Sequence, residues 1–395
     1  MASDRPAEPP ARVPPVTPAP RGRALVAWAV ILLAVAAAFV GQLVLQRTVE
    51  GRKEAAEALA EIQNRTPTGR AVYVAAMAVA GFLSLGVVGC WLQIVMAALL
   101  YLRRVRLRFT TGSPNGGIYA ETFALWIVLF MGLGLIAALV PTGPNRILVT
   151  GLLALSSLTA LAWPVVHGVP WRTVRQEIGL VWTDRAPAPR ETLDSDDAYG
   201  PAGSVLAPVG AAWTAWLARL RIPPAILEVV FGLAGYAATL PVLFVGVVLT
   251  FGLMRLYKWL FGDASDPLGI GPDPAHPIAG FLLNADWWGR VQVVLAASVG
   301  APLVEETMFR GVLYRHLREA TNRWGRALSV LASAAVVSFL FAVVHPQGIL
   351  AVPALMSLAI GFSLLREWRG TLVPSMIGHG LNNLMVTVLL LLIAG

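Results

Sequence analysis

Charged residues and cysteine are both scarce in this chain. Only 13% of its 395 residues are charged, whereas 57% are hydrophobic, and its mean hydropathy is +0.69. Because a soluble domain carries roughly 25% charged residues, this chain cannot cover a water-facing surface of ordinary size. The single cysteine, Cys90, cannot form an intramolecular disulfide, so nothing indicates an oxidising compartment.

Several catalytic signatures are also absent. The sequence has no HExxH zinc helix, no GxSxG nucleophile elbow and no cysteine in a catalytic context. It also lacks a pair of aspartates within apolar runs, which an aspartyl intramembrane protease needs. These absences exclude zincins of the soluble type and argue against serine, cysteine and aspartyl hydrolases.

Long apolar runs dominate the chain instead, and a membrane-spanning helix needs about 20 apolar residues. The runs lack the alternation of a membrane β-barrel, and hydrocarbon leaves backbone groups no partners outside a helix. We therefore predict an all-α, polytopic transmembrane helical bundle of eight or nine spans. The nine candidate spans are residues 24–45, 72–102, 122–140, 147–166, 226–253, 291–312, 328–345, 349–365 and 372–393.

Arginines set the predicted orientation of these spans. They cluster before the first span, after the second and fourth, and between the sixth and seventh, which all lie on one side if the N-terminus is cytoplasmic. Topology therefore explains the net charge of +8, and we predict no nucleic-acid partner. Nine spans would place the C-terminus on the non-cytoplasmic side, and eight would place it on the cytoplasmic side.

The runs divide the chain into five regions, of which the last holds most of the ionisable residues within spans. A short interfacial helix is expected near Trp213 and Trp216, where aromatic and basic residues meet. The regions are a disordered proline-rich tail (1–22), four spans (23–166), a cytoplasmic linker (167–222), one span with a non-cytoplasmic loop (223–286) and the last four spans (287–394).

Ionisable residues inside spans are costly, so they point to function. The sixth span holds Glu305 and Glu306, with Arg310 one turn after Glu306. Because residues four apart share a helix face, Arg310 is expected to pair with Glu306 and to leave Glu305 free to act as a base. A purely structural ion pair with a spare acid is the alternative. Glu228, in the fifth span, is expected to be interfacial or paired.

Histidines occur in two further spans. His345 ends the seventh span one turn after Phe341, and Pro346 should terminate the helix there. His379 lies in the ninth span, between two glycines and four residues before Asn383. The flanking glycines permit another helix to approach closely. The alternative interpretation of His379 and Asn383 is an ordinary hydrogen bond between helices.

Three motifs in this order on three apolar helices resemble the CPBP family of intramembrane proteases. That family includes the type II CAAX prenyl proteases and the bacterial proteins called Abi or bacteriocin-immunity proteins. The resemblance covers about residues 287–394. The motifs are EExxxR at 305–310, FxxxH at 341–345 and HxxxN at 379–383.

The resemblance implies a role for each motif residue. Glu305 would activate a water molecule, supported by the ion pair of Glu306, and His345 would hold and polarise that water. His379 and Asn383 would bind the oxyanion. A zinc ion bound by Glu305, His345 and His379 is an open alternative, since three protein ligands and an open position suit catalytic zinc. No other cofactor is implied.

Depth estimates conflict with this gathering of residues. At 1.5 Å per residue, Glu305 lies about 15 Å from the cytoplasmic end of its helix, counted from Arg315. His345 lies about 28 Å from that end, counted from Arg326. The side chains can meet only if the seventh helix begins in the cytosol or tilts, or if the segment 313–327 dips into the membrane. We give the motifs more weight than the helix boundaries.

The sequence therefore predicts an intramembrane endopeptidase in a bacterial cytoplasmic membrane. Its expected partners are the lipid bilayer and a membrane peptide or lipidated protein substrate. Two alternatives stay open: a catalytically silent scaffold or immunity protein, and a proton-coupled transporter, since ion paths also use intramembrane acids and histidines. The substrate and the oligomeric state are not predicted.

Overall fold

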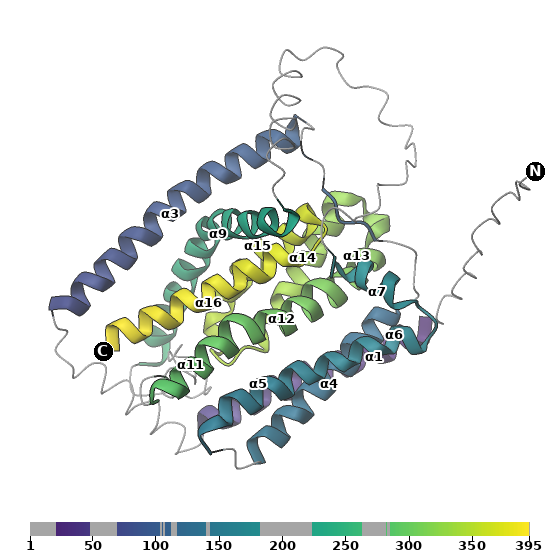
Figure 1. Ribbon diagram of the computed structural model, residues 1–395, viewed down its shortest axis with the longest axis horizontal. Coiled ribbons are helices and arrows are strands. Elements are labelled where there is room, and N and C mark those ends of the chain that lie inside the picture. The colour runs from purple at the N-terminus through teal and green to yellow at the C-terminus, as the bar shows by residue number, and fades with distance from the viewer. Residues whose placement is uncertain are drawn as a thin grey trace, which may run out of the picture.

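The computed structural model describes residues 21–47, 69–102, 105, 107–111, 117–139, 143–181, 223–262, 282 and 285–394. Within these ranges every regular element is a helix, and no strand occurs (Figure 1). The same residues contain nine helices that are long and apolar enough to cross a membrane. The prediction of an all-α polytopic bundle is confirmed.

Of the nine candidate spans among the described residues, six are single helices, and each of the other three consists of several consecutive helical elements. The first half comprises α1 (Arg21–Arg47), α3 (Gly69–Tyr101), α4 (Ile118–Leu139), η1 (Gly143–Asn145), α5 (Arg146–Ser156), η2 (Ser157–Leu161), α6 (Ala162–Val166), α7 (Trp171–Ile178) and α9 (Pro224–Phe261). The second half comprises α11 (Trp287–Leu295), η5 (Ala296–Gly300), α12 (Ala301–Glu305), η6 (Glu306–Leu313), α13 (Tyr314–Ala320), η7 (Asn322–Trp324), α14 (Arg326–Val343), η8 (Ile349–Ala351), α15 (Val352–Arg369) and α16 (Val373–Ala394).

Two buried clusters hold the bundle together. The larger one joins side chains of α1, α4, α7, η6 and α14, and the smaller one joins α9 to α15, with side chains of α3 and α16 packed against it. Outward-facing positions of the long helices are apolar as well, including Trp91 and Ile94 of α3, both more than half exposed. Because water does not favour such a surface, these faces suit lipid.

Helix α3 packs against α9 next to a proline inside α9, Pro241. Pro241 has no N–H, so the carbonyl of Ala237, four residues earlier, loses its helical donor. Gly89 of α3 lies against that carbonyl, since a Cβ there would overlap the oxygen. Gln93, one turn later, donates to the carbonyl of Ala238 at 2.7 Å. The two helices therefore meet through backbone oxygens within the apolar layer.

The sixth span is longer than its predicted limits. The prediction that this span ends before Arg315, with Arg315 and Arg318 in a cytoplasmic loop, is wrong. The helix continues to the end of α13, and both arginines are buried. Arg315 pairs with Glu319 at 2.6 Å and with Glu177 at 3.4 Å, and Arg318 pairs with Glu367 at 3.1 Å. These carboxylates make burial of the cations tolerable.

The part of the predicted linker that the structure describes, up to residue 181, is folded onto the bundle. Ile178 is completely buried. Beyond it, the carbonyl of Gly179 accepts a hydrogen bond from the Leu372 N–H at 2.9 Å, and that of Val181 accepts one from Thr371 Oγ1 at 2.7 Å. The start of α16 is thereby tied to α7.

Three predictions concern residues outside the described ranges. They are the proline-rich tail up to residue 20, the interfacial helix near Trp213, and most of the non-cytoplasmic loop after residue 262. They stay predictions. Glu228, by contrast, is described, and it is a paired residue: it contacts Arg369 at 2.6 and 3.2 Å and is fully buried.

Candidate active site

The two adjacent glutamates lie where the sixth span changes its helical register. The α-helical turn α12 ends at Glu305, and the π-helix η6 begins at Glu306, with a second π-helix, η5, before α12. Such π-helical turns occur frequently at functional sites. Glu306 is fully buried, whereas the Glu305 side chain is 20% exposed. The neighbouring carboxylates therefore lie in different environments.

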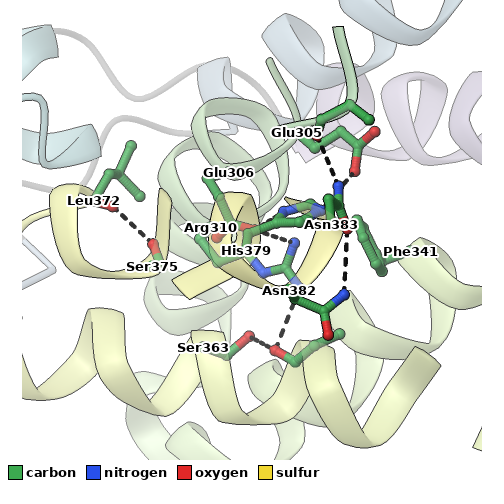
Figure 2. A network of polar contacts seen from close by, with 12 residues as sticks. Glu305, Glu306, Arg310, Phe341, Ser363, Leu372, Ser375, His379, Asn382 and Asn383 are labelled. Carbon is green, nitrogen blue, oxygen red and sulfur yellow. Dashed lines mark hydrogen bonds and ion pairs between the residues drawn. The ribbon is translucent and has the colours of Figure 1, made fainter. Parts of the chain in front are cut away.

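Glu306 is held by two partners through one oxygen. Its Oε1 lies 3.1 Å from Nη1 of Arg310 and 2.9 Å from Nδ1 of His379 (Figure 2). The expected pair of residues four apart is therefore present, and Arg310 also donates to the carbonyl of Ala359 at 3.3 Å. The cation compensates the buried carboxylate, and the carboxylate orients the imidazole of His379.

His345 lies just beyond the end of α14, where Pro346 was predicted to stop the helix. Its Nδ1 lies 2.6 Å from the carbonyl oxygen of Phe341. Because a carbonyl only accepts hydrogen bonds, Nδ1 carries the proton. The ring also packs on the Phe341 ring, with 4.1 Å between their centroids. These two contacts set the tautomer of His345 and direct its Nε2 away from α14.

Glu305 stands between the two histidines. Its Oε2 lies 3.7 Å from Nε2 of His345 and 3.7 Å from Nε2 of His379. Both distances exceed that of a direct hydrogen bond, and Oε2 is buried without a hydrogen-bond partner. Each histidine uses Nδ1 elsewhere, so each Nε2 is left to face the carboxylate. One carboxylate oxygen and two imidazole nitrogens that face a common point can hold a water molecule or a metal ion.

Two phenylalanines enclose these polar groups. Phe362 stacks on His379, with 5.5 Å between ring centroids and 21° between ring planes. Phe341 lies 4.4 Å from the guanidinium carbon of Arg310 and meets His379 edge to face. Aromatic walls limit the access of water, and a lower local dielectric strengthens the charge interactions within the site.

Asn383 contacts the π-helix η5 because of a proline. Its Nδ2 donates to the carbonyl of Ala297 at 2.8 Å. In the π-helical register the donor to that carbonyl would be residue 302, and Pro302 has no N–H. One turn earlier on α16, Gly380 lies against the carbonyl of Ser298, because a Cβ there would come within 2.5 Å of the oxygen. A glycine and an amide thus seat α16 on η5, as Gly89 and Gln93 seat α3 on α9.

The conflict between the predicted depths is resolved by the length of the sixth span. The prediction counted from Arg315 as the end of the helix, but the chain turns only between Thr321 and Gly325. Counted from this turn, the hairpin of α13 and α14 brings Glu305 and His345 to similar heights. The three predicted motifs therefore meet at one place, and all six predicted site residues contribute to it.

A comparison with known families agrees with this arrangement. Residues 287–385 match the model of the type II CAAX prenyl endopeptidase Rce1-like family. This segment is therefore similar to the CAAX-type intramembrane proteases. We call residues 287–385 the Rce1-like segment, and every predicted site residue falls within it. With nine apolar helices among its described residues, the chain is an integral membrane protein. No curated protein and no solved structure matches the chain.

The Rce1-like segment carries donor types that suit zinc, but in a loose arrangement. Glu305, His345 and His379 offer one oxygen and two nitrogens. Two ligands on tetrahedral zinc, with bonds of about 2.0–2.1 Å, lie about 3.3–3.4 Å apart, which is less than the 3.7 Å seen here. No group of three or more His, Cys, Asp or Glu side chains in the described ranges has metal-binding geometry. The donors would have to draw together to bind an ion.

The residues that support the site were not predicted from the sequence. Pro302 was a usable signal, because a proline within an apolar helix frees a carbonyl for another partner. Nothing local marks Phe362, which stacks on His379, or α7, which is tied to the first turn of α16. Tyr236, on α9, donates to Asn382 at 3.4 Å and lies outside the Rce1-like segment. Contacts of this kind depend on helices that are distant in sequence.

Proposed function

We propose that the Rce1-like segment hydrolyses a peptide bond of a membrane-associated or lipid-anchored substrate, using a water molecule activated by Glu305. The observation that carries this proposal is the approach of Glu305 Oε2 to Nε2 of both His345 and His379 at 3.7 Å. Oε2 is buried and has no hydrogen-bond partner within the protein, so it is suited to accept a proton from a bound water.

The reaction assigns one task to each side chain. Glu305 takes a proton as the water O–H bond breaks, and the oxygen attacks the carbonyl carbon of the substrate. His345 accepts the second hydrogen of the water at Nε2 and thereby orients it. The C–N bond then breaks, and the proton on Glu305 passes to the departing nitrogen.

The negative charge that develops on the substrate oxygen needs donors. Asn383 has one N–H left after its bond to Ala297. His379 can donate from Nε2 when both of its ring nitrogens carry hydrogen, and the Glu306 carboxylate then accepts from Nδ1. Donors held in place before the reaction stabilise an oxyanion without reorganisation, and each is typically worth 10²–10³-fold in rate.

A zinc ion is the alternative means of activating the water. Its ligands would be Glu305, His345 and His379, and it would supply a bound water of lowered pKa. Glu306 would then still orient His379 through Nδ1. Metal analysis of the purified protein, together with the effect of chelators on turnover, separates the two forms of the proposal.

We assign the arginine-rich end of the bundle to the cytoplasmic side of a bacterial cytoplasmic membrane. The exposed basic residues Arg323 and Arg326 lie at the same end as the buried ion pairs of Arg315 and Arg318. The site lies deeper than these pairs, so a substrate reaches it along the bilayer or from the cytosol.

Turnover by the purified protein in liposomes tests the proposal. The probe is a farnesylated peptide that ends in a CAAX sequence, and its products are identified by mass spectrometry. We expect Glu305→Gln to lower the rate of cleavage by about 10²–10⁴-fold, because the amide cannot accept the proton. Glu121→Gln is the matched control, since Glu121 lies on α4 and contacts Trp163 at 2.9 Å.

The outcomes separate this function from its alternatives. Equal cleavage by wild type and Glu305→Gln would remove the assignment of the base. A folded wild-type protein that cleaves neither this probe nor membrane-anchored peptides without a lipid would support a silent scaffold. Proton flux that depends on Glu305, without cleavage, would support a transporter.

A further inference from the structure

The amide of Asn383 is held at both ends. Its Nδ2 donates to the carbonyl of Ala297 at 2.8 Å, and its Oδ1 accepts from Nδ2 of Asn382 at 3.2 Å. The Oδ1 of Asn382 in turn accepts from the hydroxyl of Tyr236, on α9, at 3.4 Å. Figure 2 shows Asn382 and Asn383 beside His379 on the same turns of α16.

We propose that Tyr236 and Asn382 are positioning residues for Asn383, so that α9 completes the active site from outside the Rce1-like segment. The inference rests on the proposed function, because it concerns the orientation of the amide that faces the reacting carbonyl. Neither residue touches the substrate in this proposal.

The order of donors and acceptors makes the orientation of the Asn383 amide unique. If the amide were turned over, its NH₂ would face the NH₂ of Asn382, and its oxygen would face the carbonyl oxygen of Ala297. Both new contacts would be repulsive. The carbonyl of Ala297, which only accepts hydrogen bonds, therefore fixes the orientation of the Asn383 amide, and Asn382 and the Tyr236 hydroxyl hold the other end of that amide in place.

Tyr236, the first donor of this hydrogen-bond chain, is held in place by its packing. The side chain is 2% exposed and packs with Leu240, Leu358 and Phe362. Phe362 also stacks on His379, so one aromatic layer supports both the histidine and the amide chain. Gly378 allows this packing, because a Cβ there would lie 3.2 Å from the Phe362 ring and 3.5 Å from Cβ of Tyr236. Removing only the hydroxyl should leave the packing unchanged.

Turnover of the farnesylated probe gives the first test. Tyr236→Phe and Asn382→Ala are each expected to lower kcat per folded enzyme by about 3- to 10-fold with little change in KM. Because both act through the same amide, Tyr236→Phe should have no further effect in the Asn382→Ala background. Thr239→Val is the matched control on α9, since the Thr239 hydroxyl bonds only the carbonyl of Gly235 in its own helix.

Proton exchange of the Asn383 side-chain amide gives a second test that needs no turnover. In protein labelled with ¹⁵N-asparagine, Tyr236→Phe should accelerate this exchange by about tenfold, and Thr239→Val should not. The inference is overturned if both kcat and exchange in Tyr236→Phe lie within twofold of wild type. It is also overturned if the effects of the two variants simply add. A wild-type protein without turnover, in which Tyr236 still governs exchange, would instead contradict the proposed function.

Discussion

His379 and Glu306 are 73 positions apart in the sequence, and they contact each other through Nδ1 and Oε1 at 2.9 Å. The same oxygen meets Arg310 at 3.1 Å. Glu306 is thereby engaged in orienting an imidazole, whereas Oε2 of Glu305 has no hydrogen-bond partner in the protein. The pair of glutamates thus consists of one carboxylate that orients His379 and one with an oxygen that remains available to a water molecule.

Removing Arg310 alone should be more harmful than removing both charges of its ion pair. Arg310→Met leaves the Glu306 carboxylate buried and uncompensated, so we expect the free energy of unfolding to fall by about 3–5 kcal/mol. The double variant Glu306→Gln/Arg310→Met should recover at least half of this loss. It should stay inactive, because His379 loses its carboxylate. Unfolding in mixed micelles measures the stabilities, and a double variant as unstable as the sum of the single ones would contradict the prediction.

A methyl group at Gly380 should impair the site by moving a helix. In Gly380→Ala the new Cβ would come within 2.5 Å of the Ser298 carbonyl, so α16 must move away from η5. We expect turnover to fall at least about tenfold, because His379 and Asn383 move with α16. Gly134→Ala is the matched control in α4, where a Cβ meets open space. Equal turnover of the two variants would show that the close approach is unimportant.

Restoring an N–H at position 302 should weaken the bond between Asn383 and η5. In Pro302→Ala the new N–H can donate to the carbonyl of Ala297 and compete with the amide. We expect kcat to fall by about 3- to 10-fold, whereas the stability stays constant or increases. Pro353→Ala is the control, since Pro353 lies in the first turn of α15, where the N–H has no helical partner. A reduced stability with unchanged kcat would contradict the prediction.

The contact between α7 and the bundle should depend on pH. Burial raises the pKa of Glu177 above its usual value of 4.5 and outweighs Arg315 and Tyr119, which lower it. The folded state therefore binds more protons than the unfolded state between 4.5 and the raised pKa. The contribution of Glu177 to the free energy of unfolding is complete below pH 4.5 and is lost as the pH rises through the raised pKa.

The variant Glu177→Gln isolates this contribution. Its free energy of unfolding should fall less than that of wild type as the pH rises across the same window. The comparison uses unfolding at several pH values in one detergent. Parallel curves for the two proteins would show that Glu177 does not titrate differently in the folded state.

Much of the fold could be predicted because its signals are local. Twenty apolar residues in a row define a span, and residues four apart share a face, which is why the Glu306–Arg310 pair was expected. The burial of Arg318 was not predictable from its neighbours, because its carboxylate partner is Glu367, 49 positions away. An arginine beside an apolar run resembles a membrane flank unless such a partner is known.

The sequence predicted which residues would gather, but it did not predict their geometry. Motif residues on three helices were expected to gather, but their heights came out wrong because the end of the sixth helix was misplaced at Arg315. The π-helical register that separates Glu305 from Glu306 follows from backbone hydrogen bonds that no residue pattern encodes. The catalytic roles of these residues stay predictions.

The seats of α3 and α16 have a consequence for how this bundle can change. Each helix packs a glycine and an amide against two main-chain oxygens, and one oxygen of each pair lacks a helical donor because of Pro241 or Pro302. Main-chain oxygens are common to all amino acids, so no replacement at Ala237 or Ala297 can delete them. Side chains elsewhere in the bundle can therefore be replaced while α3 and α16 keep their places.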